Sequence, residues 1–189
     1  MRGSAFSGID REKILGLKTL IIGEAGSGKT RALAELLERL VAEGHARDMV
    51  VIDLAPPRMG KIGGTITEYI KLPNEAAYLR PSLVYAPRTQ ACNMDDVIRY
   101  AKHNAENARL LFKQYMEKPR PLLAINDLTI FLHAGELDEL LNIIKISRTF
   151  IGTAYYGSSL AEDYGSGISL REKLLVEELK HHMDRVVML

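Results

Sequence analysis

Short apolar runs alternate along the chain with longer stretches in which apolar residues recur every three or four positions. Five apolar runs are typical of strands, most of them buried on both faces of a parallel sheet. They lie at 19–22, 49–54, 122–125, 149–155 and 185–189. The periodic stretches predict helices. These lie at about 28–43, 94–117 and 136–146, with a last helix from 169 onward. The alternation predicts an α/β fold with a mostly parallel sheet.

Several of the expected helices carry end signals of their own. Gly44 is placed to end the first helix, Asn93 is placed as the N-cap of the helix at 94–117, and Pro119 closes that helix. Ser169 and Glu172 have the spacing of a capping box, so we expect the last helix to open at Ser169.

The segment 57–90 has the composition of a long loop, and loops of this length are often functional. Within it, 82–85 predicts a short strand, whereas 65–70 fits either a helical turn or a strand. The segment also holds four basic side chains, Arg58, Lys61, Arg80 and Arg88. Such side chains are ordinarily solvated, but together in one loop they form a candidate phosphate clamp or a finger for a neighbouring subunit.

Size and charge narrow the class of protein. With 189 residues, 47% of them apolar and 26% charged, the chain suits one globular domain spanning 1–189. The formal net charge of +1 gives no overall attraction to nucleic acid or to an anionic membrane. The lone Cys92 excludes an internal disulfide framework. No apolar run approaches the ~18 residues that span a bilayer, and there is no signal-peptide pattern, so we expect a cytoplasmic protein with no membrane partner.

Residues 23–30 match the pattern G-x-x-x-x-G-K-[ST] at every fixed position, between an apolar run and a helical stretch. Glycines in such a loop let successive backbone N–H groups turn toward phosphate oxygens, and the following helix points its positive end at them. We expect Lys29 to reach the β- and γ-phosphates of ATP and the Thr30 hydroxyl to bind Mg²⁺. The predicted nucleotide-binding residues are Gly23, Glu24, Ala25, Gly26, Ser27, Gly28, Lys29, Thr30 and Arg31. The alternative interpretation is that residues 23–30 form a glycine-rich turn between a strand and a helix and bind no ligand.

A phosphate-binding loop also needs a second carboxylate near the metal, at the end of a neighbouring strand. Asp53 and Asp127 both stand at the end of apolar runs, where parallel strands line a nucleotide crevice. Either could instead be a turn or helix cap. Small kinases and GTPases tend to place this acid early in the chain, whereas additional-strand ATPases place it later. The order along this chain favours Asp127.

The chain resembles RecA-like and KaiC-like ATPases of the additional-strand P-loop class. Residues 8–30, GIDREKILGLKTLIIGEAGSGKT, are similar to the entry of these proteins, and residues 181–189, HHMDRVVML, are similar to their last helix end and strand. The resemblance follows most of the chain in the order of elements but is residue-specific only in the phosphate loop. It implies a three-layer α/β/α P-loop NTPase fold, with Lys29 and Thr30 on phosphate and Mg²⁺ and Asp127 as the second acid.

The family's catalytic glutamate, which lies just past the second strand, has no counterpart here, because residues 53–56 read Asp-Leu-Ala-Pro. Asp53 or Glu24 could polarise the attacking water, or hydrolysis could be slow. Of these we favour Asp53.

The resemblance also places a nucleic-acid-binding loop at 157–169. Glu162 and Asp163 are the only ionised residues of this loop. Its charge therefore does not support contact with phosphates, although Tyr155, Tyr156 and Tyr164 could stack on bases. Surface or core packing is the more ordinary role of such tyrosines.

We therefore expect an ATP-binding, Mg-dependent ATPase whose nucleotide state controls loops or contacts with a protein partner or further copies of the chain. Its expected catalytic residues are Lys29, Asp53 and Asp127, and its expected metal ligands are Thr30 and Asp127. Two alternatives stay open. One is a small-molecule or nucleotide kinase, with 57–90 as acceptor site and lid and Asp53 as base. The other is a module that binds nucleotide without hydrolysing it.

Overall fold

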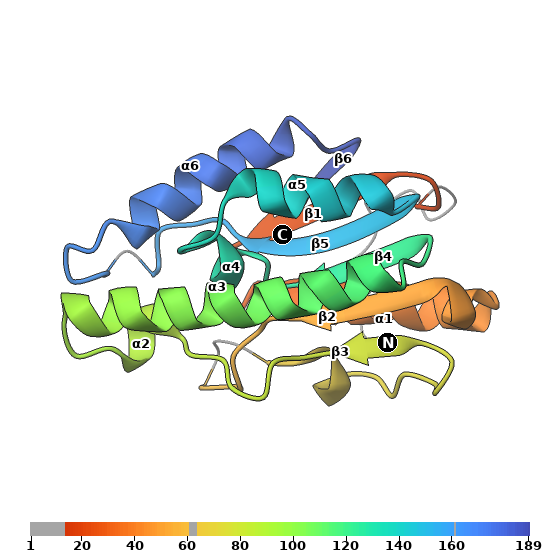
Figure 1. The fold of residues 1–189 in the computed structure, drawn as a ribbon, viewed down its shortest axis with the longest axis horizontal. Helices are drawn as coiled ribbons and strands as arrows, with labels where there is room; N and C mark the ends of the chain where they lie inside the picture. The colour runs from red at the N-terminus through yellow and green to blue at the C-terminus, as the bar shows by residue number, and fades with distance from the viewer. Residues whose placement is uncertain (1–13, 61–63, 161) are drawn as a thin grey trace, which may run out of the picture.

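Six parallel strands form one sheet in the order β3-β2-β4-β5-β1-β6 (Figure 1). This computed structural model describes residues 14–60, 64–160 and 162–189. The strands are β1 (Lys18–Gly23), β2 (Met49–Asp53), β3 (Ala77–Leu79), β4 (Leu122–Asn126), β5 (Thr149–Tyr155) and β6 (Arg185–Met188). The first part of the lead-in at 8–30 and Lys61 lie outside the described residues.

Helices cover both faces of the sheet (Figure 1). They are α1 (Lys29–Ala42), α2 (Pro87–Gln90), α3 (Met94–Glu117), α4 (Thr129–Leu132), α5 (Leu137–Ile146) and α6 (Ile168–Lys180), with 3₁₀ turns η1 (His45–Asp48) and η2 (Ile66–Glu68). The α/β class and the parallel sheet are confirmed. In the part of the chain that the structure describes, no helix is both long and apolar enough to cross a membrane.

Two hydrophobic layers follow from the alternation of side chains along each strand. In β2 all five residues are buried. Val50 and Ile52 pack in the layer that includes α3, α5 and α6, whereas Met49 and Val51 pack with α1 on the opposite face. A strand buried on both sides has no polar alternation, which explains why these strands are visible as continuous apolar runs in the sequence.

Most expected strands and helices are confirmed, and the misplaced strand belongs to one edge of the sheet. The five strands expected from apolar runs agree within one residue at each end, and the helix at 94–117 agrees at both ends. The strand expected at 82–85 is wrong. The edge strand is instead β3, which pairs with β2 in the register Val50↔Ala77. The segment 65–70, left open from the sequence, forms the turn η2 with a capping box between Thr65 and Glu68.

The capping box expected at Ser169 and Glu172 is also wrong. Helix α6 begins at Ile168 after Gly167, whose backbone is left-handed (φ 80°). Glu172 is 2% exposed, and its carboxylate bonds to an arginine and a histidine from other elements. The local pattern assigned the Glu172 side chain to the helix cap, but this side chain forms a long-range ion pair with Arg88 instead.

Candidate functional site

The predicted phosphate loop joins the carboxyl end of β1 to the start of α1. The strand ends at Gly23 and the helix begins at Lys29. Gly26 (φ 75°) and Gly28 (φ 94°) adopt left-handed backbone conformations that would strain a residue with a Cβ. The first amides of a helix have no partner within it, so the opening turn of α1 presents donors suited to an anion.

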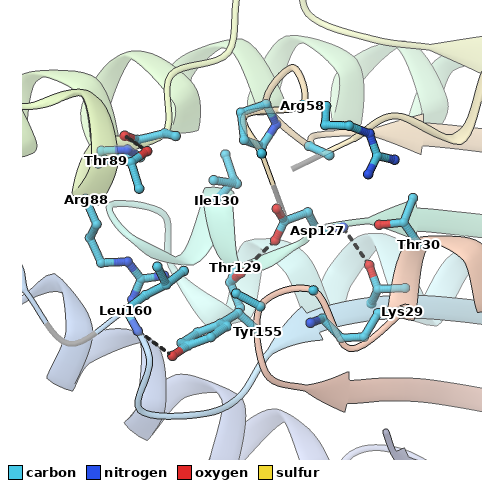
Figure 2. A pocket seen from close by; sticks show the side chains of 18 of the residues that line it. Lys29, Thr30, Arg58, Arg88, Thr89, Asp127, Thr129, Ile130, Tyr155 and Leu160 are labelled. Carbon is cyan, nitrogen blue, oxygen red and sulfur yellow. Dashed lines mark hydrogen bonds between the residues drawn. The ribbon is translucent and has the colours of Figure 1, made fainter. Parts of the chain in front are cut away.

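A cavity of about 270 Å³ opens beside this loop. Its wall is made by the predicted phosphate loop, the segment after β2, helix α2, the segment after β4, and the end of β5. Lys29, Thr30 and Asp127 line it together, although they come from two different strand ends (Figure 2). The predicted metal ligands and the predicted phosphate-binding lysine therefore share one site.

The predicted nucleotide-binding residues divide into two groups. Ala25, Gly26, Gly28, Lys29 and Thr30 line the cavity. Gly23, Glu24, Ser27 and Arg31 are not among the described residues that line it. The Arg31 side chain is 63% exposed and pairs with Glu35 one turn further along α1, so its local environment is that of a surface ion pair.

The Lys29 ammonium lies against the carbonyl groups of its own loop. Nζ donates to the carbonyl oxygen of Gly23 at 2.9 Å and to that of Glu24 at 2.6 Å. Burial lowers the pKa of Lys29, although the negative charges of Asp127 and nearby glutamates act in the opposite direction. Because both hydrogen-bond acceptors are neutral, an anionic ligand would gain much from this desolvated charge.

Asp127 begins the segment after β4 with a left-handed backbone (φ 56°), uncommon for a residue other than glycine. Its N–H donates to Thr153 Oγ1 at 2.7 Å, and its Oδ1 accepts from Thr129 Oγ1 at 2.9 Å. Burial raises the pKa of Asp127, and the Lys29 charge and the Thr129 hydrogen bond only partly offset this. The first contact holds the backbone and the second holds the carboxyl group of Asp127, which lines the cavity (Figure 2).

Asp53 has a different environment from Asp127. It is fully buried and is not among the described residues that line the cavity. Its Oδ2 accepts from the Ile66 amide (2.7 Å) and from the Tyr78 hydroxyl (2.8 Å). Its Oδ1 accepts from Asn126 Nδ2 at 2.9 Å. These donors occupy the carboxylate, so the geometry does not favour Asp53 as the group that activates water.

Asp53 instead supports Asp127 through a line of hydrogen bonds across the strand ends. Asn126, bonded to Asp53, accepts from the Thr153 hydroxyl at 3.0 Å. That same hydroxyl accepts the Asp127 N–H. The line ties the ends of β2, β4 and β5 together and fixes the backbone of Asp127.

Asp53→Asn is expected to lower the free energy of unfolding by about 2–4 kcal/mol, because an amide would point N–H groups at partners that are themselves donors. Urea unfolding measures this loss. Asp48→Asn is the control, since the Asp48 side chain is 52% exposed. If folded Asp53→Asn protein lost all Mg-ATP turnover at unchanged stability, this result would support a catalytic role for Asp53.

Glu24, the other candidate for activating water, is committed to the loop after β5. Its Oε1 accepts from the Ser158 amide at 2.6 Å, and its Oε2 accepts from the Ser159 hydroxyl at 2.5 Å. These hydrogen bonds lower the pKa of Glu24 to about 2. The carboxylate thus anchors the segment for which the resemblance implied nucleic-acid binding, and it does so away from the described cavity wall.

The basic residues of 57–90 separate in the fold. Arg58 and Arg88 line the cavity. Arg58 Nε pairs with Glu68 at 2.5 Å and its Nη2 donates to the Tyr69 hydroxyl at 2.6 Å. Arg80 lies away from the described cavity wall, with Nη1 3.9 Å from Asp53 Oδ1.

Sequence reasoning missed the roles of three residues at this site, which are His133, Glu172 and Tyr155. His133 and Tyr155 line the cavity, and Glu172 pairs with Arg88 and His133. Tyr155 is 8% exposed, so its ring is not available to stack on a nucleic-acid base. The sequence signal for Glu172 was present but pointed to a helix cap.

The donor set fits Mg²⁺ in the presence of a nucleotide. Mg²⁺ usually takes one or two protein oxygens and completes its octahedron with water and phosphate. Thr30 and Asp127 supply a hydroxyl and a carboxylate in one cavity. Among the described residues no group of three or more His, Cys, Asp or Glu could hold a metal by itself.

Comparisons with known proteins add little. No protein-family model matches the chain, and no curated protein matches it. A solved structure of a protein from Pyrococcus horikoshii OT3, described only as a structural study, matches with a TM-score of 0.34 and 10% identity. That match covers 86% of this chain and 80% of the other. A likeness at this level carries no argument about function.

Proposed function

We propose that this protein binds a nucleoside triphosphate with Mg²⁺ and hydrolyses its terminal phosphoryl bond, as an ATPase of the RecA-like P-loop class. One observation carries the proposal. The loop at 23–30 matches the phosphate-binding pattern completely, and its Lys29 and Thr30 share a cavity with a carboxylate from another strand, Asp127.

The strand order supports the additional-strand class. β5 lies between β1, which leads into the phosphate loop, and β4, which leads into Asp127. The acid that shares the cavity also comes late in the chain, after β2, β3 and α3. Both features agree with the class that the sequence resembles.

Each residue then has a distinct chemical task. Lys29 neutralises charge on the β- and γ-phosphates, and the opening amides of α1 bind phosphate oxygens. Thr30 and Asp127 would hold Mg²⁺, which when bound neutralises charge on the phosphates. Asp53 and Glu24 are engaged elsewhere, and this geometry supports slow intrinsic hydrolysis.

A kinase is the second candidate, and one observation favours it. The cavity extends beyond the phosphate loop to Arg58, Tyr69 and Arg88, all from the 57–90 segment. That extension offers room for an acceptor. The kinase proposal no longer has Asp53 as its base, because that carboxylate is buried under its own hydrogen bonds.

Phosphate release from Mg-ATP, with and without a panel of nucleosides and metabolites, separates the candidates. We expect slow release without any acceptor and no release when Mg²⁺ is chelated. Stimulation by a single acceptor, with phosphate appearing on that acceptor, would favour the kinase. Tight binding of ATP with neither activity would favour a nucleotide-dependent binding module.

A further inference from the structure

Three side chains from separate elements form a buried ion cluster beside the cavity: Arg88 of α2, His133 after α4, and Glu172 of α6. Arg88 Nη1 and Nη2 donate to the two carboxylate oxygens of Glu172 at 2.8 Å and 3.1 Å. His133 Nε2 lies 2.7 Å from Glu172 Oε2. The side chains of Arg88, His133 and Glu172 are 7%, 1% and 3% exposed. This Glu172 cluster is therefore almost fully withdrawn from solvent.

Stability alone is a weak reason for such a cluster. Taking charges out of water costs several kcal/mol for each ion, and well-packed apolar residues often serve a fold equally well. Burial by itself would raise the pKa of Glu172, but the charges and hydrogen bonds of His133 and Arg88 outweigh it and lower that pKa. Glu172 is accordingly a carboxylate with two cationic or polar partners, both of which also line the cavity.

The cluster has unused hydrogen-bonding capacity. An ionised carboxylate only accepts, so His133 Nε2 carries the hydrogen and His133 Nδ1 is the remaining ring nitrogen. Among the described residues, Nδ1 is buried and has no hydrogen-bond partner. A guanidinium has five N–H donors, and Glu172 takes two of those of Arg88. Among the described residues the other three donors of Arg88 have no hydrogen-bond partner, and Arg88 lines the cavity.

The Arg88 guanidinium is close to the predicted phosphate site. Its Cζ lies 4.9 Å from the centre of the Tyr155 ring, and Lys29 Nζ lies 6.0 Å from the centre of the same ring. Figure 2 shows the Tyr155 side chain between the two cations, with Asp127 above them. The Glu172 charge acts on the pKa values of both Lys29 and Asp127, which again places the cluster near the predicted phosphate and metal ligands.

We propose that Arg88 contacts the terminal phosphate of the bound triphosphate, and that Glu172 and His133 are positioning residues that hold its guanidinium at the cavity wall. This inference rests on the proposed function. Under this proposal, Arg88 lets the protein distinguish a nucleoside triphosphate from a diphosphate without a residue from a neighbouring subunit. A guanidinium fixed on one side by a carboxylate presents its remaining donors in a rigid fork, which suits phosphate oxygens.

Binding of Mg-ADP and of a non-hydrolysable Mg-ATP analogue, measured by competition with a fluorescent nucleotide, tests the proposal. Arg88→Gln is expected to weaken binding of the triphosphate analogue about tenfold and to leave ADP within about twofold of wild type, as for one lost charged hydrogen-bond contact. Glu172→Gln is expected to weaken binding of the triphosphate analogue about three- to tenfold. Because Glu172 acts through Arg88, the double variant is expected to lose no more than Arg88→Gln alone.

Arg109→Gln is the matched control. Arg109 also forms a forked pair with a glutamate, Glu139, at 2.6 Å and 2.8 Å, but lies outside the described cavity wall. The Arg109→Gln substitution is expected to change neither the affinity for the triphosphate analogue nor the affinity for ADP. Arg88→Lys keeps the charge and supplies the same comparison if Arg88→Gln does not fold, with an expected loss of about threefold for the analogue.

Two results would overturn the inference while leaving the proposed function intact. One is an unchanged preference for triphosphate in the Arg88 variants. The other is an equal loss for ADP and the analogue in folded protein. Wild-type protein that binds neither nucleotide would instead overturn the proposed function, and the inference with it.

Discussion

Lys29→Ala is expected to lower the rate of Mg-ATP turnover by about 10²–10³-fold, the usual cost of removing one fixed group that stabilises developing charge. Its ammonium is desolvated, and among the described residues its hydrogen bonds go to the neutral carbonyls of Gly23 and Glu24. A phosphate would therefore gain a charge-assisted contact in a low-dielectric site. Phosphate release under single-turnover conditions, with nucleotide in deficit, measures the chemical step.

The control for this variant is Lys113→Ala, which removes an exposed lysine from α3 and is expected to leave turnover unchanged. Thermal unfolding of both variants checks that the loop still folds. Turnover within about threefold of wild type in folded Lys29→Ala protein would contradict both the phosphate-loop assignment and the ATPase proposal.

Asp127→Asn is expected to reduce Mg-ATP turnover about 10²-fold and to raise the Mg²⁺ concentration needed for half-maximal rate. The substitution keeps the size of the side chain and an oxygen that can accept from Thr129, so it removes mainly charge. A titration of turnover against Mg²⁺ measures the effect. Asp138→Asn, at an exposed position in α5, is the control and is expected to change neither quantity.

The dependence of kcat/KM on pH gives a separate test of Asp127. Burial raises its pKa in the folded protein. If the ionised form binds the metal, kcat/KM falls as the pH drops through this raised pKa, so the acidic limb lies above the usual aspartate range. The limb is expected to disappear in Asp127→Asn. A limb that persists unchanged, or a full rate with the Asn variant, would remove Asp127 from the metal site.

The sequence alone could not show that Asp53 and Asp127 have different environments in the folded protein. Asp53 and Asp127 both follow buried strands, and parallel strands bring such ends to one edge of a sheet. They differ only in what the rest of the fold places around them. The Ile66 amide of η2 and the Tyr78 hydroxyl of β3 fill acceptor sites of Asp53. No local pattern predicts where these donors lie, because their positions depend on the path of the chain between β2 and β3 and on the pairing of β3 with β2.

By itself, the sequence determined the central strands, the long helix α3 and the phosphate-binding pattern at 23–30, because continuous apolar runs, helical periodicity and glycine spacing are local properties of the chain. It also supplied Lys29, Thr30 and Asp127 as separate candidates. Only the tertiary structure decided that these three share a cavity, that Asp53 and Glu24 are engaged elsewhere, and that Glu172 joins Arg88 and His133. The physical reason is that Arg88 and Glu172 are 84 residues apart in sequence, so only the packing of α2, α4 and α6 creates their contact.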